Sequence, residues 1–213
     1  MHAAVAHQFD DIEQQRSAVT LGMWVFLAQE VMFFGGAFCA YVCYRALYPD
    51  VFGHVSHHLD VRLGTFNTAV LIASSLTMAL AVHAAQSGRR GGAIVMWLVW
   101  TMGLGSTFLG VKAYEYWHKF HEHLVPGPHF VYPGADAPQA QLFFSIYFIL
   151  TGLHAIHMII GIGLLLWLVR DSLRGRYSAL YNAPVENVGL YWHFVDIVWI
   201  FLFPLLYLIG RHA

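Results

Sequence analysis

The chain has 213 residues, of which 58% are hydrophobic and only 11% are charged, whereas about 25% of the residues of a soluble domain are charged. This composition excludes an ordinary soluble domain, and a net charge of −1 gives no basis for nucleic-acid binding. The two cysteines form no CxxC or CxxCH motif, so the sequence has no dithiol redox motif and no c-type haem attachment motif.

Five long apolar segments predict five transmembrane helices. A segment of about 20 apolar residues is long enough to cross the bilayer core as a helix, and such segments lie at about 20–46, 64–86, 92–118, 140–169 and 187–210. We therefore predict an all-α fold, a polytopic bundle with one membrane domain over 20–213. The polar segment 1–19 precedes it and has no apolar core, so we expect the first span to serve as the insertion signal.

The positive charges of the loops predict how the bundle is oriented. With five spans, the N-terminal segment and the 87–91 and 170–186 loops share one side of the membrane. That side carries the larger number of basic residues: Arg16, Arg89, Arg90, Arg170, Arg174 and Arg176. Short cytoplasmic loops carry an excess of Lys and Arg, so we predict a cytoplasmic N-terminus and a C-terminus outside.

The first span carries an acidic residue, Glu30, well inside its apolar sequence. An ionisable side chain at that depth should face protein and have a partner. Cys39 and Cys43 are four residues apart and share one helix face, and we expect them to be buried thiols. Arg45 ends the span and is expected at the outer interface.

The second and third spans contain further polar side chains. A stripe in the second span could hydrogen-bond across helices: Asn67, Ser74, Ser75 and Thr77. In the third span, Lys112 and Glu115 are i, i+3 neighbours. We expect them to anchor the span at the outer interface, a structural role, within a belt of aromatic residues: Tyr114, Tyr116 and Trp117.

Histidines are concentrated in the 47–63 and 119–139 loops. The patterns HxxHH at His54–His58 and HxxHxH at His118–His123 have spacings that could ligate a metal. The alternative is that these are surface histidines, which the proline- and glycine-rich sequence PGPHFVYPG favours.

The polar residues of the spans predict a buried polar layer. At about 1.5 Å per residue, Glu30, His157 and Asp196 lie roughly 15, 18 and 14 Å from the cytoplasmic ends of their spans. His193 and His154 flank this layer at roughly 9 and 22 Å. We expect Glu30 and His157 to pair, with Asp196 nearby. Two roles remain open: hydrogen bonds that fix helix packing, or a proton relay.

The depths of the histidines argue against a haem or copper site. A bis-histidine haem needs two histidines at matching depth on facing helices, and the only matching pair, His154 and His157, lies on one helix. The spans hold no Cys/His/Met cluster for copper. We expect the chain to bind no cofactor of its own. Small residues suggest close helix packing: Gly35, Gly36, Ala40, Gly103, Gly105, Gly110, Gly152, Gly161 and Gly163.

Five segments in chain order carry a resemblance to a known family. They are LGMWVFLAQEVMFFGGAFCAYVCYR, FNTAVLIASSLTMALA, FLGVKAYEYWH, TGLHAIHMIIG and WHFVDIVWIFLF, the last preceded by Glu186 and Tyr191. Together they resemble subunit III of the haem–copper terminal oxidases, the cytochrome c oxidase subunit III family. The chain is similar to the five-helix bacterial form, which lacks the first two of seven helices. Gln29 stands before Glu30, where the family usually has serine.

The resemblance implies a non-redox subunit of a proton-translocating terminal oxidase in the bacterial inner membrane. Haem and copper would be held by partner subunits, and this chain would pack against subunits I and II and against phospholipid. It would stabilise subunit I and support proton uptake during aerobic electron transport. On this basis the chain itself would contribute no catalytic residue.

Two alternative functions remain open from the sequence. One is the related accessory subunit of a nitric oxide reductase, which shares this fold. The other is a proton-coupled transporter, which would be expected to show discontinuous helices or repeat symmetry.

Overall fold

A computed structural model describes residues 8–88, 91–133, 135–177 and 181–208. The described residues are mostly helical and form no strand. The elements are α1 Ile12–Leu47, α2 Pro49–Ser56, α3 Val61–Gln86, α4 Gly91–His121, α5 Ala137–Leu173, α6 Ala183–Phe203 and the π-helical turn η1 Pro204–Leu208. Within the described residues, five helices are long and apolar enough to cross a membrane: α1, α3, α4, α5, and α6 with η1. This confirms the predicted all-α, five-helix class.

α1 begins earlier than the apolar pattern predicts. It starts at Ile12 rather than near residue 20, because Asp11 caps it: the backbone N–H of Gln14 donates to Asp11 Oδ1 at 2.7 Å. Its 36 residues span roughly 54 Å at 1.5 Å per residue, more than the roughly 30 Å apolar core of a bilayer. Hydropathy locates the membrane-crossing part, and the cap determines where the helix begins.

A short helix that the sequence did not predict, α2, lies between α1 and α3. Pro49 occupies its first turn, where the missing N–H costs nothing. Phe52 of α2 is fully buried, with its ring centroid 5.8 Å from that of Tyr41 and 5.3 Å from that of Phe143. Because Tyr41 belongs to α1 and Phe143 to α5, α2 joins the ends of these two helices.

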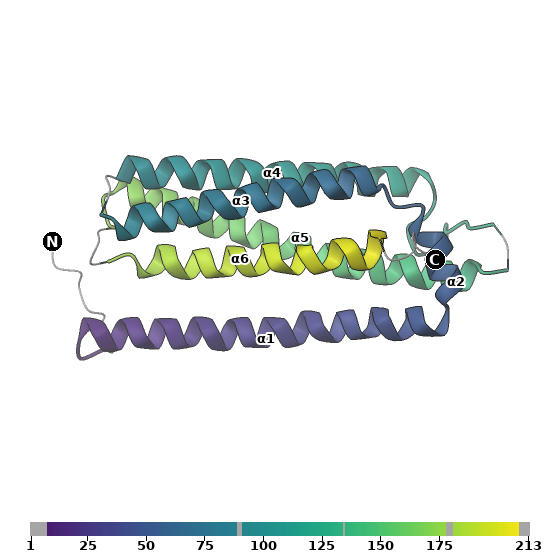
Figure 1. Ribbon diagram of the computed structural model, residues 1–213, viewed down its shortest axis with the longest axis horizontal. Coiled ribbons are helices and arrows are strands. Elements are labelled where there is room, and N and C mark those ends of the chain that lie inside the picture. The colour runs from purple at the N-terminus through teal and green to yellow at the C-terminus, as the bar shows by residue number, and fades with distance from the viewer. Residues whose placement is uncertain (1–7, 89–90, 134, 178–180, 209–213) are drawn as a thin grey trace.

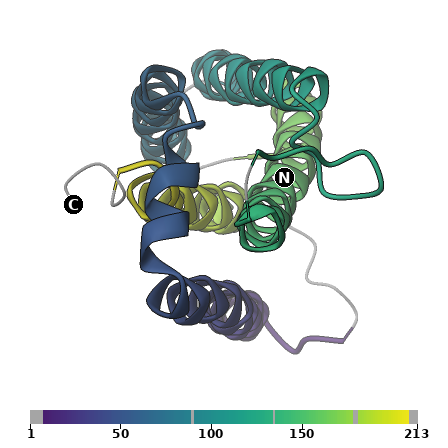
Figure 2. The same ribbon diagram turned by 90° about the vertical axis from the view of Figure 1, so that its right-hand side faces the viewer.

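α6 is the central helix of the bundle. Figure 1 shows α3, α4, α5 and α6 side by side, with α1 apart from them. The end-on view of Figure 2 places α6 in the middle, α3, α4 and α5 around one side, and α1 on the other. In the most apolar stretch of α6 and η1, 61% of the residues are buried, whereas the share in α1 is 17%. The core therefore surrounds α6, and α1 is peripheral.

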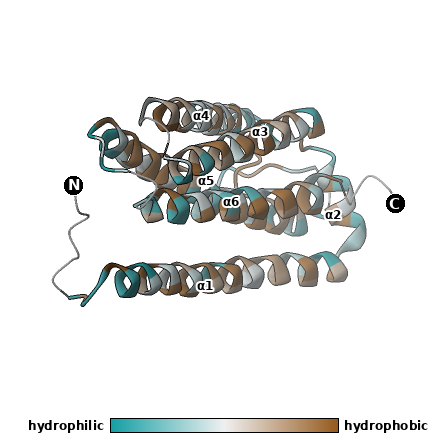
Figure 3. Ribbon diagram, turned by 60° about the vertical axis from the view of Figure 1, so that its left-hand side comes forward, coloured by the Kyte–Doolittle hydropathy of each residue, from teal (hydrophilic) through white to brown (hydrophobic). Residues whose placement is uncertain are grey.

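α1 leaves most of its apolar surface uncovered. Figure 3 shows hydrophobic residues along its length and hydrophilic ones at its N-terminal end. Only Phe34 and Tyr41 of this helix are buried. Cys39 and Cys43 are exposed, so the prediction that they are buried thiols is wrong. They do share one face, but that face points away from the bundle.

Candidate functional site

Glu30 of α1 and His157 of α5 lie in contact. Glu30 Oε2 is 3.1 Å from His157 Nε2, and the two side chains are 12% and 14% exposed. Phe34 packs its ring edge against the imidazole, with centroids 5.1 Å apart, and the hydroxyl of Tyr191 donates to the backbone carbonyl of His157 at 2.9 Å. The contact therefore connects α1, α5 and α6.

The geometry of this contact requires a shared proton. His157 Nδ1 is 2.8 Å from the backbone carbonyl oxygen of Leu153, and a carbonyl can only accept, so Nδ1 carries a proton. The hydrogen bond between Nε2 and Glu30 then needs one further proton, either on the imidazole or on the carboxyl group. The pair can thus hold a proton and transfer it between two atoms within the membrane-spanning region.

His193 and Asp196 occupy a different part of the bundle. His193 Nδ1 is 2.7 Å from Ser75 Oγ of α3, and both residues line a groove between α3 and α6 together with Asp196. Residues two apart on a helix point in nearly opposite directions, so His193 faces α3 while Tyr191 faces His157. In the described chain, no hydrogen bond or ion pair joins this group to Glu30. The single polar layer expected from the sequence is therefore two separate groups in the structure: Glu30 with His157, and His193 with Asp196.

His154 is sealed inside an aromatic environment. Its side chain is fully buried, and its ring centroid lies 5.3 Å from those of Phe108 and Trp199. Neither ring nitrogen has a hydrogen-bond partner among the described residues. His154 therefore shares neither the Glu30 contact nor the groove of Asp196.

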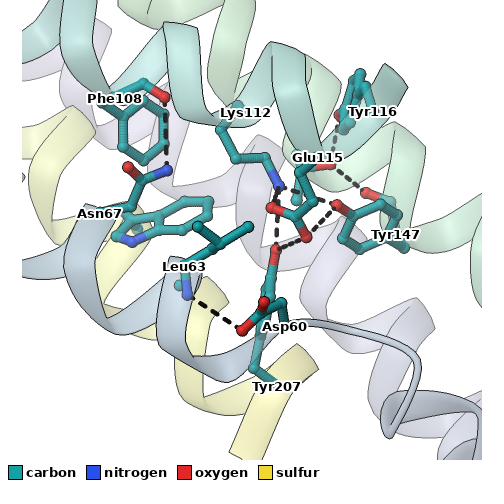
Figure 4. A network of polar contacts seen from close by, with 12 residues as sticks. Asp60, Leu63, Asn67, Phe108, Lys112, Glu115, Tyr116, Tyr147 and Tyr207 are labelled. Carbon is teal, nitrogen blue, oxygen red and sulfur yellow. Dashed lines mark hydrogen bonds and ion pairs between the residues drawn. The ribbon is translucent and has the colours of Figure 1, made fainter. Parts of the chain in front are cut away.

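The most extensive polar cluster lies deep between α4, α5 and η1 (Figure 4). Lys112 Nζ lies 3.0 Å from Glu115 Oε2, 2.9 Å from the hydroxyl of Tyr147 and 3.1 Å from that of Tyr207. Both hydroxyls donate to Glu115 Oε1, Tyr147 at 2.9 Å and Tyr207 at 2.6 Å. The ammonium group also lies 5.4 Å from the ring of Trp199, a cation–π distance.

This cluster differs from the expected interface anchor. Lys112 and Glu115 are each only 3% exposed, so they are buried within the bundle and do not lie on its surface. Tyr114 and Trp117 are more than half exposed, as a belt requires, but Tyr116 turns inward and its hydroxyl contacts Thr151 Oγ1 at 2.5 Å. α4 continues to His121, so Lys112 lies within the helix and not at its end.

Arg45 secures the end of α1. Its Nη1 donates to the hydroxyl of Tyr41 at 3.1 Å, and that hydroxyl donates to the carbonyl oxygen of Leu205 at 2.8 Å. Leu205 belongs to η1, so this chain of hydrogen bonds fixes α1 against the end of α6.

The predicted polar stripe of α3 does hydrogen-bond across helices. Trp192 Nε1 of α6 donates to Ser74 Oγ at 2.8 Å, and Thr77 Oγ1 lies 2.8 Å from Thr101 Oγ1 of α4. Asn67 Nδ2 donates to the carbonyl oxygen of Phe108 of α4 at 3.5 Å, and Ser75 bonds to His193 of α6. All four stripe residues therefore join α3 to its neighbours, as predicted.

Lys119 was not among the site residues expected from the sequence. It is 4% exposed, and its Nζ lies 2.5 Å from Glu122 Oε2. Partial burial raises the pKa of Glu122, but the hydrogen bond and charge of Lys119 outweigh this and lower it below its usual value. The two residues line a cavity of about 490 Å³ that reaches Glu115. The i, i+3, i+7 spacing of Lys112, Glu115 and Lys119 is a signal that places all three on one face.

The loop histidines do not gather into a metal site. His57, His58 and His118 line the same cavity, and His118 Nδ1 is 3.3 Å from Glu122 Oε1. Across the described ranges, no group of three His, Cys, Asp or Glu side chains is arranged to hold a metal ion.

Comparison with known proteins identifies the family. Residues 7–211 match the family model described as cytochrome c oxidase subunit III. The chain is 32% identical over 208 residues to cytochrome c oxidase subunit 3 of Thermostichus vulcanus, covering 97% of this chain and 92% of that relative. It is 35% identical over 194 residues to cytochrome c oxidase subunit 3 of Corynebacterium diphtheriae, covering 90% and 88%.

Relatives with a different electron donor in their names are nearly as similar. Quinol oxidase subunit 3 of Bacillus subtilis is 33% identical over 199 residues, which cover 89% of this chain and 86% of the relative. The match extends over nearly the whole described bundle, including all five membrane-crossing helices, and it favours the oxidase interpretation over a transporter. The chain is therefore a multi-pass membrane protein that belongs to the cytochrome c oxidase subunit III family.

Proposed function

We propose that this chain is the non-redox subunit III of an aerobic terminal oxidase of the cytochrome c oxidase type. In this role it stabilises the catalytic subunit I and supports proton uptake during oxygen reduction, in the bacterial inner membrane. Subunits I and II are its protein partners, the haem and copper belong to those partners, and phospholipid covers apolar surface that they leave free.

The observation that carries the proton-uptake role is the Glu30–His157 contact. An ionisable pair inside a membrane-spanning bundle is costly and marks proton or ion pathways in many membrane proteins. Here the pair shares a proton at 3.1 Å and keeps 12–14% of its side-chain surface exposed. It can therefore exchange a proton with a neighbouring subunit or with water, which the fully buried His154 cannot do.

The stabilising role is supported by the uncovered apolar surface of α1. Trp24, Met32 and Phe33 are 59%, 78% and 48% exposed, on a helix that buries two residues only. In a membrane, helices associate through packing and hydrogen bonds rather than through exclusion of water. α1 thus offers a long face to a larger partner.

The test is purification through an affinity tag on this chain in a mild detergent. We expect haem absorbance in the purified sample and oxidase subunits I and II in its mass spectrum. A colourless chain that purifies alone and intact would contradict the proposal.

A second candidate differs only in the electron donor. The quinol oxidase subunits among the relatives favour a quinol-oxidising complex as the alternative. The purified complex decides between them, because a cytochrome c oxidase consumes oxygen with reduced cytochrome c, and a quinol oxidase consumes it only with a quinol.

A further inference from the structure

The hydroxyl of Ser75 lies between two ionisable side chains on the face of α6 that packs against α3. His193 and Asp196 are three residues apart on α6, so they share this face. His193 Nδ1 lies 2.7 Å from Ser75 Oγ, and the Asp196 carboxyl group lies beside the same hydroxyl. A serine hydroxyl carries one proton and accepts at two lone pairs. Ser75 can therefore connect the imidazole to the carboxyl group.

The Asp196 carboxyl group has no direct access to the surface of the bundle. The residue is 3% exposed, and both carboxyl oxygens are buried. Among the described residues, Ser75 is the only side chain that acts on this group, and no cation is paired with it. An ionised carboxylate without a cation is costly inside a membrane. The group therefore holds a proton at rest, and the Ser75 oxygen is the acceptor to which it can pass.

His193 is the member of this group that reaches the groove between α3 and α6. Its ring is half-buried, and Nε2 makes no hydrogen bond in the described part of the chain. The groove has a volume of about 420 Å³, and no further ionisable side chain of the described residues lines it. Several water molecules fit in this volume, since each occupies about 30 Å³. The imidazole thus lies between the water-accessible groove and the buried carboxyl group.

We propose that Ser75, His193 and Asp196 form a proton-holding site, in which Asp196 stores a proton and exchanges it with water in the groove through Ser75 and His193. The site is additional to the Glu30–His157 pair and lies on another face of α6. It goes beyond the proposed function, because it requires only this chain and water.

Release of the stored proton consists of three proton transfers in a row. In the resting state the Asp196 O–H donates to Ser75 Oγ, the Ser75 O–H donates to His193 Nδ1, and Nε2 carries the imidazole proton. When Nε2 gives its proton to a water molecule, Nδ1 takes the proton of Ser75, and Ser75 takes the proton of Asp196. The site then holds a carboxylate, an intact hydroxyl and a neutral imidazole protonated at Nδ1. One proton has left with the water, and uptake reverses each transfer.

Infrared spectroscopy of the purified protein after transfer into D₂O reads this proton directly. A protonated carboxyl group has a C=O stretch that shifts when deuterium replaces its proton, and isotope-labelled aspartate together with Asp196→Asn assigns the band. We expect the unsubstituted protein to show the band and to exchange its proton. Ser75→Ala and His193→Phe should keep the band but slow the exchange by about tenfold or more, the effect of about 1.4 kcal/mol on the barrier.

Two further variants separate the proton path from packing. Ser74→Ala removes the neighbouring hydroxyl, which bonds to Trp192, and should leave the exchange rate unchanged. Ser75→Thr keeps a hydroxyl at the required position and should exchange as the unsubstituted protein does.

Four results would overturn the proposal: no Asp196 band at any pH at which the protein is folded, a band that does not exchange in the unsubstituted protein, unchanged exchange in Ser75→Ala and His193→Phe, or equal slowing in Ser74→Ala. The measurement reads the carboxyl group itself. Its outcome is therefore distinct from the co-purification of haem, which tests the proposed function.

Discussion

The Lys112–Glu115 cluster shows how this bundle holds two opposite charges in its interior. The hydroxyls of Tyr147 and Tyr207 each bond to both the ammonium group and the carboxylate group. Such a pair stabilises a fold only while both charges are present, because removing one leaves the other buried without compensation.

Lys112→Met tests this dependence. We expect it to lower the free energy of unfolding by about 3–5 kcal/mol, the usual cost of breaking a buried pair, measured as a lower Tm of the full chain in detergent. The double variant Lys112→Met/Glu115→Gln removes both charges and should recover most of that loss. Equal stability of the single variant and the wild type would show that the two charges are not coupled.

The Glu30–His157 pair makes a prediction about turnover rather than stability. Glu30→Gln keeps a side chain that can hydrogen-bond to His157 Nε2, but an amide cannot exchange a proton in this way. We expect an assembled complex with normal haem content and a several-fold lower steady-state rate of oxygen consumption. Gln29→Ala, which changes the exposed neighbour, is the matched control and should leave the rate unchanged. A Glu30→Gln complex with full activity would assign the pair a packing role only.

Among the helices, Trp192 of α6 is the residue that fixes the positions of α4 and α5. A Cβ added at Gly105 of α4 would lie 2.8 Å from its ring, and one added at Gly161 of α5 would lie 2.9 Å from it. The ring is also held from α3, through the hydrogen bond to Ser74. The two glycines therefore let α4 and α5 approach the indole, and Ser74 bonds to it from α3.

Gly105→Ala and Gly161→Ala should each destabilise the bundle by about 1–3 kcal/mol, because overpacking a close contact forces a backbone or rotamer shift. Gly103→Ala and Gly163→Ala, two residues away on the same helices, have nothing within 4 Å of the added Cβ and should be neutral or slightly stabilising. Thermal unfolding of the four variants in one detergent provides the comparison, and similar losses at all four sites would contradict this packing account.

The glycines also show what sequence alone could predict. The composition and the lengths of the apolar segments predict the number of spans. The depth of the polar residues within their spans predicts that Glu30 contacts His157. Nine small residues suggest close packing, yet Gly35, Gly36 and Gly110 have open space beside them. Which face of each helix turns inward depends on the partner helix, and a single sequence does not contain that information. For the same reason Lys112 and Asp196 lie in surroundings that depth and spacing did not predict.

At the scale of the whole molecule, the two ends of the bundle differ in chemistry. One end has the capped start of α1 and the arginine-rich connections, including Arg170, Arg174 and Arg176. The other has α2 and the histidine-lined cavity with its Lys119–Glu122 pair. If the basic end is cytoplasmic, as loop charge predicts, the cavity opens on the outer side of the membrane.

Reporter fusions decide this orientation. Alkaline phosphatase needs disulfides, which form outside the cytoplasm, so a fusion after residue 133 or after residue 213 should be active. A fusion after Gly88 should be inactive, and it is the internal control because it lies in the α3–α4 connection, on the opposite side of the membrane from the other two fusions. The reverse pattern would place Lys119, Glu122 and the loop histidines in the cytoplasm. The Glu30–His157 pair would then have to take its protons from the end that carries this cavity, and the proton-uptake proposal would need a different entrance.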